Sequence, residues 1–251
     1  RMEAKLPVPT DKTTVLVIAP NAAVASQWVR EALGMMEETD IWSHTAGAFG
    51  TALQRRFAGA ERTSPPPRLV VVTRHQLQSE MQGVFKSHRA AGGFKPSSLA
   101  PHLSQKFAIA LEHKYNAVVK LKKDKTYVKG QHKDGDESTP AGGVLAMHRQ
   151  EQNRLAKRAS VPYIWSMVLI DEVHELKNLH TLATMLATCV GMHAPRVVAI
   201  SGTGYNNNLQ DMATLHMLID PEWKYADVHF WRDMMEDPET VRGRYIRRNE
   251  E

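Results

Sequence analysis

Four short runs of apolar, mostly β-branched residues constrain the fold of this chain more than any other feature. Each run is apolar along its whole length, which predicts strands that are buried on both faces of a sheet. Longer segments with helical spacing of apolar residues separate the runs, so neighbouring strands require crossover connections. We therefore predict a mostly parallel sheet between layers of helices, a three-layer α/β/α sandwich. The four predicted strands cover residues 15–19, 68–73, 167–170 and 196–200.

The segments between the runs predict the remaining elements. Apolar periodicity predicts helices over residues 24–38, 51–57, 73–82, 144–159, 179–190 and 209–219, and residues 41–44 suggest a brief strand. The helix over residues 179–190 is expected to be amphipathic, and residues 89–101 are expected to form a loop because they are rich in Gly, Ser and Pro. Residues 117–120 and 126–129 are expected to pair as a hairpin, followed by a polar, mobile segment over 130–143.

Composition is that of a folded globular protein. Of 251 residues, 42% are hydrophobic and 24% are charged, which argues against disorder throughout. No apolar run approaches the ~20 residues needed to cross a bilayer, so we predict no membrane partner. The only cysteine, Cys189, excludes an internal disulfide and a zinc site built from cysteines, and its apolar helix predicts a buried thiol. The net charge of +5 permits a nucleic-acid partner without requiring one.

The third apolar run is followed by Asp171-Glu172-Val173-His174. Ligands of parallel sheets bind at the carboxyl ends of the strands, so this position is a candidate site. In phosphoryl transfer, one acid at such a place holds Mg²⁺ and a neighbour activates the attacking water. Asp171 suits the metal role and Glu172 the base role, whereas the alternative is the start of a helix with surface acids. His174 and His180 are six positions apart, so they do not match the zinc-protease pattern.

Polar or small residues follow the other three runs as well. After the fourth run, hydroxyl groups and glycine would let the backbone approach a phosphate, although a simple turn is the alternative. The polar residues after the first two runs suit contacts with a nucleic-acid backbone, and ordinary strand-to-helix turns explain them almost equally well. These candidates are Ser201, Gly202 and Thr203 after the fourth run, Pro20 and Asn21 after the first, and Thr73 and Arg74 after the second.

Two segments resemble motifs of the Swi/Snf-type ATPases, which belong to the superfamily-two helicases. Residues 165–178, around the Asp171-Glu172 pair, resemble motif II, and residues 200–211 are similar to motif III. The 30 positions between Asp171 and Ser201 match the family spacing. Residues 16–31 and 70–73 look like motifs Ia and Ib, so the resemblance runs through most of the chain in the family's order.

The resemblance implies that residues 1–251 are part of the first RecA-like lobe of a P-loop NTPase, with an insertion at about 86–143. It further implies ATP and Mg²⁺ as cofactors, DNA and a second RecA-like lobe as partners, and a nuclear location. The implied roles are Mg²⁺ coordination by Asp171, water activation by Glu172, a link to motif III or the second lobe by His174, coupling by Ser201 and Thr203, and DNA contact by Pro20, Asn21, Thr73 and Arg74.

Three departures from the family pattern leave alternatives open. No Gly-Lys-Thr or Gly-Lys-Ser occurs in the sequence, Gly204 replaces the motif III proline, and the second lobe with its arginine finger is absent. The chain starts at Arg1 rather than methionine, so we expect it to be a piece of a longer protein, with negligible turnover and weak ATP affinity on its own. One alternative is a degenerate, non-hydrolysing lobe that binds protein or nucleic acid. Another is a strand-separating helicase or nuclease-associated motor of the same superfamily.

Overall fold

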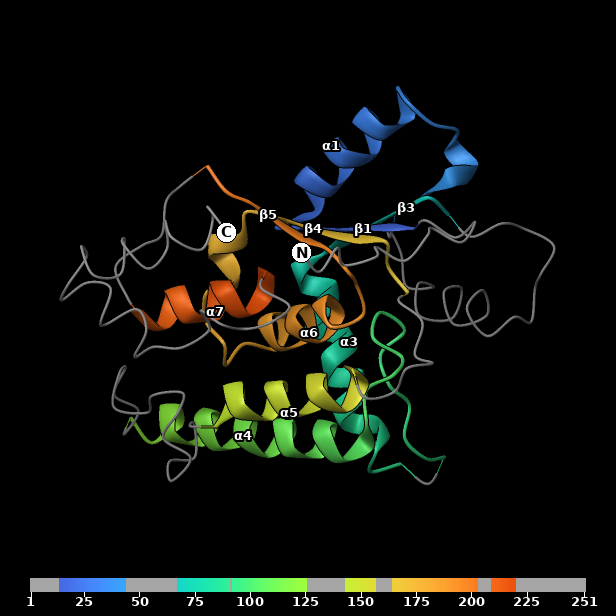
Figure 1. Cartoon of the computed structure of the whole chain (residues 1–251). Coiled ribbons are helices and arrows are strands. Elements are labelled where there is room, and N and C mark those ends of the chain that lie inside the picture. Colours follow the sequence, from blue (N-terminus) through green and yellow to red (C-terminus); the bar gives the residue numbers. More distant parts are fainter. Residues whose placement is uncertain are drawn as a thin grey trace, which may run out of the picture.

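The computed structural model contains a five-stranded sheet in which all paired strands are parallel, in the order β2-β3-β1-β4-β5 (Figure 1). The structure describes residues 14–43, 67–90, 92–125, 143–156, 164–202 and 209–219. The predicted parallel sheet is therefore confirmed, and its central strands are the apolar runs that the sequence singled out. The strands are β1 (Val15–Ala19), β2 (Ile41–Ser43), β3 (Leu69–Thr73), β4 (Met167–Asp171) and β5 (Val197–Ile200).

Helices cover the two faces of this sheet unequally. Figure 1 shows α1 on one side, α3, α6 and α7 on the other, and α4 and α5 packed outside that second helix layer. The predicted α/β/α layering is confirmed, with α4 and α5 as an addition to it. Among the described helices, none is long and apolar enough to pass through a membrane. The helices are α1 (Ala22–Leu33), α3 (Arg74–Ser87), α4 (Gln105–Lys123), α5 (Val144–Ala156), α6 (Leu182–Gly191) and α7 (Leu209–Ile219), with short 3-10 turns η1 (Glu38–Asp40) and η2 (Val173–Leu176).

Two separate hydrophobic cores result from this arrangement. Alternate residues of a strand point to opposite faces of the sheet, and β4 shows this clearly. Val168 and Ile170 belong to the large core beneath the sheet, whereas Leu169 packs against the smaller core under α1. Asp171 has the same parity as Leu169 and therefore lies on the α1 side.

The predicted hairpin is wrong, because residues 117–120 lie inside the 19-residue helix α4. The β-branched pair Val118-Val119 favours a strand locally, but tertiary packing overrides such a preference. Phe107 and Leu111 bury one face of α4 in the large core, and three lysines in its last turn complement the helix dipole. Ser104 caps the first turn by accepting a hydrogen bond from the backbone N–H of Phe107 (3.2 Å). Residues 126–142 lie outside the described part of the chain, and the assignment of 86–143 as an insertion stays a prediction.

The helix that was predicted as amphipathic is α6, and it is not amphipathic. All nine residues from Leu182 to Val190 are buried. A helix that is enclosed on all sides belongs to the interior of a layered structure, and α6 lies in contact with α3 and α7. Cys189 is among these residues, so the predicted burial of its thiol is confirmed, and burial raises the pKa of that thiol. The short helix expected at 51–57 falls outside the described residues.

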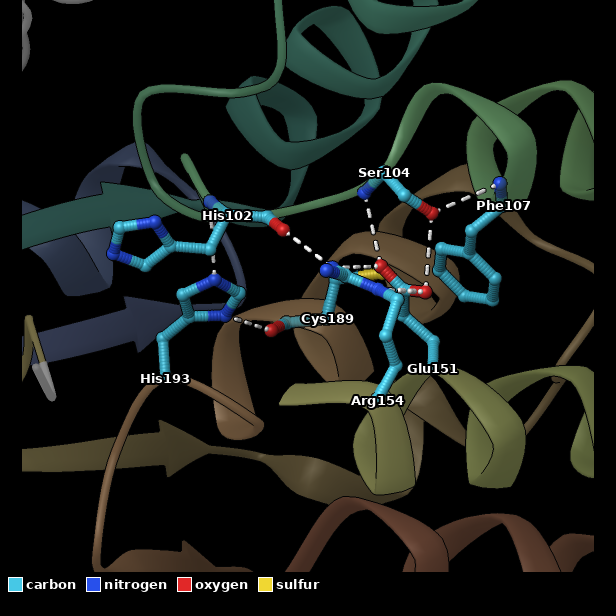
Figure 2. A network of polar contacts seen from close by, with 7 residues as sticks. All are labelled: His102, Ser104, Phe107, Glu151, Arg154, Cys189 and His193. Atoms are coloured by element: carbon cyan, nitrogen blue, oxygen red, sulfur yellow. Dashed lines mark hydrogen bonds and ion pairs between the residues drawn. The ribbon is translucent and has the colours of Figure 1, made fainter. Parts of the chain in front are cut away.

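A buried polar network joins α5 to the segment before α4 and to the end of α6 (Figure 2). Arg154 donates hydrogen bonds to both carboxylate oxygens of Glu151 (2.6 and 2.8 Å) and to the backbone carbonyl of His102 (2.7 Å). The backbone N–H and the hydroxyl of Ser104 also donate to Glu151. Burial raises the pKa of Glu151, but the hydrogen bonds from Arg154 and Ser104 outweigh it and hold the pKa below its ordinary value.

Candidate functional site

The carboxyl ends of four neighbouring strands form one rim of the sheet. The register pairs Ala19 of β1 with Thr73 of β3 and Asp171 of β4 with Ile200 of β5, and β1 lies beside β4. The residues that follow these strands are therefore side by side, although Pro20 and Ser201 are 181 positions apart in the sequence. Every candidate residue that the structure describes lies at this rim, where ligands of open parallel sheets bind.

Asp171 ends β4 and is half-buried on the α1 side of the sheet. Its Oδ2 accepts a hydrogen bond of 2.8 Å from the indole Nε1–H of Trp28 on α1. The side chain is thus held at the rim, where its oxygen atoms can coordinate a cation.

Glu172 has a left-handed backbone, with φ of 49° and ψ of 51°. A residue other than glycine adopts this conformation at a cost of about 1–3 kcal/mol, and such strain clusters at functional sites. The conformation turns the chain sharply from β4 into η2, so the side chains of Asp171 and Glu172 take different directions. Asp171 and Glu172 therefore have different neighbours, Trp28 for Asp171 and His174 for Glu172.

His174 lies between Glu172 and Ser201, the residue after β5. Its Nδ1 is 3.1 Å from Oε2 of Glu172 and 3.0 Å from the hydroxyl oxygen of Ser201. Within the described residues, Oε2 of Glu172 is enclosed and accepts no hydrogen bond of good geometry. The Glu172 side chain as a whole is 40% exposed, so its carboxylate can accept a proton or a hydrogen bond from water.

The small residues after β5 are only partly described. Ser201 and Gly202 are exposed, and Thr203 lies outside the described residues, as does Gly204. The hydroxyl of Ser201 contacts the ring of His174. Of the three residues predicted after the fourth apolar run, Ser201 is therefore linked through His174 to the Asp171-Glu172 pair.

The four candidates for nucleic-acid contact also lie at the rim, and three of them have structural partners. Asn21 caps α1 by accepting a hydrogen bond from the N–H of Val24, and Thr73 forms a capping box with Gln76 at the start of α3. Capping explains these two side chains without any ligand. The partner of Arg74 is Glu175 of η2, with which it forms an ion pair, whereas Pro20 is half-buried directly after β1.

The donor set at the rim fits Mg²⁺ bound together with a nucleotide. Within the described residues, no group of three His, Cys, Asp or Glu side chains is arranged to hold a metal ion. Mg²⁺ commonly takes one or two protein carboxylates and completes its shell with phosphate oxygens and water. Asp171 can supply such a carboxylate. The carboxylate of Glu172 and the hydroxyl of Ser201, which lie close by, are oxygen groups that are compatible with a bound Mg²⁺.

Two residues of this site were not among the sequence candidates. Trp28 contacts Asp171, and Glu175 pairs with Arg74. The sequence offers only indirect signals for them, because Trp28 fits the apolar spacing of its helix and Glu175 follows an acidic motif. Their partners lie 143 and 101 positions away, so only the folded sheet brings them together.

A family model described as SNF2-related domain matches residues 4–249, almost the entire chain. No curated protein matches the chain.

Proposed function

This chain belongs to the SNF2-related domain family, whose members generally hydrolyse ATP, and on that premise we propose that it is part of the first RecA-like lobe of a DNA-dependent motor. The motor would couple ATP hydrolysis to movement along duplex DNA and to the remodelling of nucleosomes or other DNA-bound proteins. The observation that carries the proposal is the cluster of Glu172, His174 and Ser201 beside Asp171 at one rim of the sheet. It joins the two segments that resemble motifs II and III.

In this proposal, Asp171 holds the Mg²⁺ of Mg-ATP and Glu172 acts as the general base. Bound Mg²⁺ supplies positive charge to the phosphates during phosphoryl transfer. The side chain of Glu172 is 40% exposed, so its carboxylate can accept the proton of an attacking water. The left-handed backbone of Glu172 separates its side chain from that of Asp171, which suits two acids with two roles.

His174 would pass changes at Glu172 to the segment after β5. Its Nδ1 is within hydrogen-bonding distance of both Glu172 and Ser201, so one proton on that nitrogen has two possible acceptors. A change in the charge of Glu172 alters which acceptor is favoured. This provides a physical route from the base to Ser201.

DNA would lie across the ends of β1 and β3, where Pro20, Asn21, Thr73 and Arg74 are found. Arg74 is the one cation among these four, and its ion pair with Glu175 is half-exposed. Half-exposed pairs of this kind contribute about 0–1 kcal/mol, so a DNA phosphate can displace Glu175. A second RecA-like lobe of the parent protein would complete the motor, and a remodelling role would require that protein to act in the nucleus.

The experiment that tests this function measures ATP hydrolysis by the full-length protein with and without duplex DNA. We expect duplex DNA to stimulate hydrolysis and expect ATP-dependent displacement of a triplex-forming strand, which reports movement along a duplex. DNA affinity should fall steeply as salt rises, because phosphate contacts release counterions. DNA binding without any hydrolysis would instead support a degenerate binding lobe, and a flat salt profile would contradict the DNA track.

A further inference from the structure

We propose that Trp28 is a positioning residue for Asp171, which orients the carboxylate for a divalent cation without neutralising its charge. This inference rests on the proposed metal role of Asp171. The contact that carries it is the 2.8 Å hydrogen bond from the indole Nε1–H of Trp28 to Oδ2 of Asp171.

The fold explains why these two residues meet. Helix α1 begins three residues after the end of β1 and covers the side of the sheet on which Asp171 lies. β1 and β4 are neighbours, so a residue in the second turn of α1 can reach across to the end of β4. The ring of Trp28 packs against the small core under α1, together with Leu169. Packing therefore holds the indole, and its N–H is directed at the carboxylate.

The acids of this segment differ in the charge of their partners. Glu175 pairs with the guanidinium of Arg74, and Glu172 lies next to the ionisable ring of His174. The hydrogen-bond donor to Asp171 is a neutral indole that does not ionise. An arginine or lysine at this place would compensate the carboxylate and repel a metal ion, whereas an indole fixes one oxygen and leaves the negative charge intact. Outer-shell partners of this kind typically change metal affinity 10- to 100-fold.

The test uses this chain labelled with ¹⁵N at its tryptophans, with Mn²⁺ alone as the metal probe. Trp28→Phe identifies the indole cross-peak of Trp28, and Asp171→Asn should shift that peak because its acceptor changes. Mn²⁺ should broaden the Trp28 peak before that of Trp165, whose indole donates to the carbonyl of Leu99 inside the large core and serves as the internal control. An unchanged Trp165 peak also shows that each variant is folded.

Affinity for Mn²⁺, measured from the free ion by electron paramagnetic resonance, decides the role. We expect Trp28→Phe to weaken binding about 10-fold and Asp171→Asn to weaken it at least as much. Replacing Trp28 by benzothienylalanine, in which sulfur takes the place of the N–H in a ring of the same shape, should weaken binding as Trp28→Phe does. That result would separate the hydrogen bond from the packing of the ring.

The outcomes distinguish this inference from the proposed function. If Asp171→Asn weakens Mn²⁺ binding and both replacements of Trp28 leave it unchanged or tighten it, the positioning role is overturned and the metal role of Asp171 stands. If Asp171→Asn leaves Mn²⁺ binding unchanged, the metal role fails, and the positioning role fails with it.

Discussion

Glu172 combines a strained backbone with a side-chain oxygen that is enclosed and accepts no hydrogen bond of good geometry from the described residues. Neither feature stabilises the folded chain. Left-handed backbone costs about 1–3 kcal/mol in a residue with a side chain, and the enclosed oxygen lies 3.1 Å from the ring Nδ1 of His174 without forming a hydrogen bond of good geometry. A residue with a strained backbone and a carboxylate that is weakly engaged by its neighbours is a good candidate for a chemical role, which matches the proposed general-base role.

Replacing Glu172 by glutamine tests that assignment in the full-length protein. Glu172→Gln keeps the size and shape of the side chain but cannot accept a proton from water. We expect ATP binding to be retained and hydrolysis to fall at least ~100-fold, the usual effect of losing a general base. Steady-state hydrolysis and a nucleotide-binding titration measure the two quantities. Glu37→Gln, at an exposed acid before η1, is the matched control and should leave both unchanged; undiminished turnover in Glu172→Gln would remove the residue from the mechanism.

The surroundings of His193 lead to a prediction of how the stability of the chain depends on pH. Its ring is buried between the segment before α4 and the end of α6, and it stacks on His102 with ring centroids 5.5 Å apart. Nδ1 donates to the carbonyl of Cys189 (2.7 Å), while Nε2 accepts from the backbone N–H of His102 (3.3 Å). Burial, the main cause, lowers the pKa of His193 to about 4; the Cys189 carbonyl and Glu151 raise it, whereas His102 and Arg154 lower it further.

The stability of the chain should therefore fall in mild acid. Above pH 6.5 His193 is neutral in both the folded and the unfolded chain and contributes no pH dependence. Between pH 6.5 and about 4 the unfolded chain binds the proton more readily, so folding stability is lost as the pH falls, by up to about 3 kcal/mol from this residue. Urea unfolding at a series of pH values measures the loss.

Substituting His193 isolates its share of the acid sensitivity. His193→Gln cannot be protonated in this range, so the loss of stability between pH 6.5 and 4 should become shallower. It should not vanish, because burial also lowers the pKa of His148, to about 3. His113→Gln, at an exposed histidine of α4, is the control and should keep the wild-type slope. Parallel pH profiles for the His193 variant and the wild type would contradict the prediction.

At the scale of the element, one buried acid, Glu151, is central to the polar contacts that attach α5 to the rest of the lobe. Glu151 is 4% exposed and receives hydrogen bonds from Arg154 on its own helix and from Ser104 at the start of α4. A bidentate pair with a guanidinium is geometrically specific. The position of α5 relative to α4 thus depends on a polar network as well as on apolar contact.

Removing this acid should destabilise the fold. Glu151→Ala leaves Arg154 without its carboxylate and the N–H of Ser104 without an acceptor, so we expect a loss of about 3 kcal/mol in the free energy of unfolding. The Arg154 side chain is 29% exposed and can regain contact with water, which keeps the loss at the low end of the range. Chemical denaturation measures it. Gln150→Ala, at the exposed neighbour on α5, should change stability by less than about 0.5 kcal/mol; equal effects of the two substitutions would refute the network as the cause.

At the scale of the whole molecule, the two sides of the sheet differ in how deeply they are buried. Helix α6 is enclosed over nine consecutive residues, whereas only Ala32 of α1 is buried and Leu33 beside it is 46% exposed. Segments with few buried apolar contacts open at lower free energy than the core. The α1 side, which carries Trp28 and the cap residue Asn21, is therefore the side on which local opening should occur.

Hydrogen exchange tests this asymmetry directly. We expect backbone amides of residues 22–33 to exchange well before those of residues 182–191, because opening α1 exposes the small core alone, whereas opening α6 disrupts the large one. Mass spectrometry of peptides from the two helices gives the comparison. Equal protection of the two helices would show that the chain opens only as one unit.

Much of the architecture could be predicted because its causes are local. A run such as residues 69–72 is apolar at every position, and this pattern alone requires cover on both faces, whichever strand lies beside it. Asp171, Glu172 and Ser201 could be proposed for a similar reason. Each directly ends or follows such a run, and parallel strands bring their carboxyl ends to the same rim.

The features that could not be predicted depend on partners far along the chain. Val118 and Val119 favour a strand locally but form part of α4, because Phe107 and Leu111 of the same helix are buried against the large core. The sequence by itself determined the parallel strands and the acids at their ends, since these follow from the pattern of neighbouring residues. Only the tertiary structure decided the strand order, the enclosure of α6 and the contact of Trp28 with Asp171. These features depend on which elements pack together in the folded chain, and those elements are far apart in the sequence.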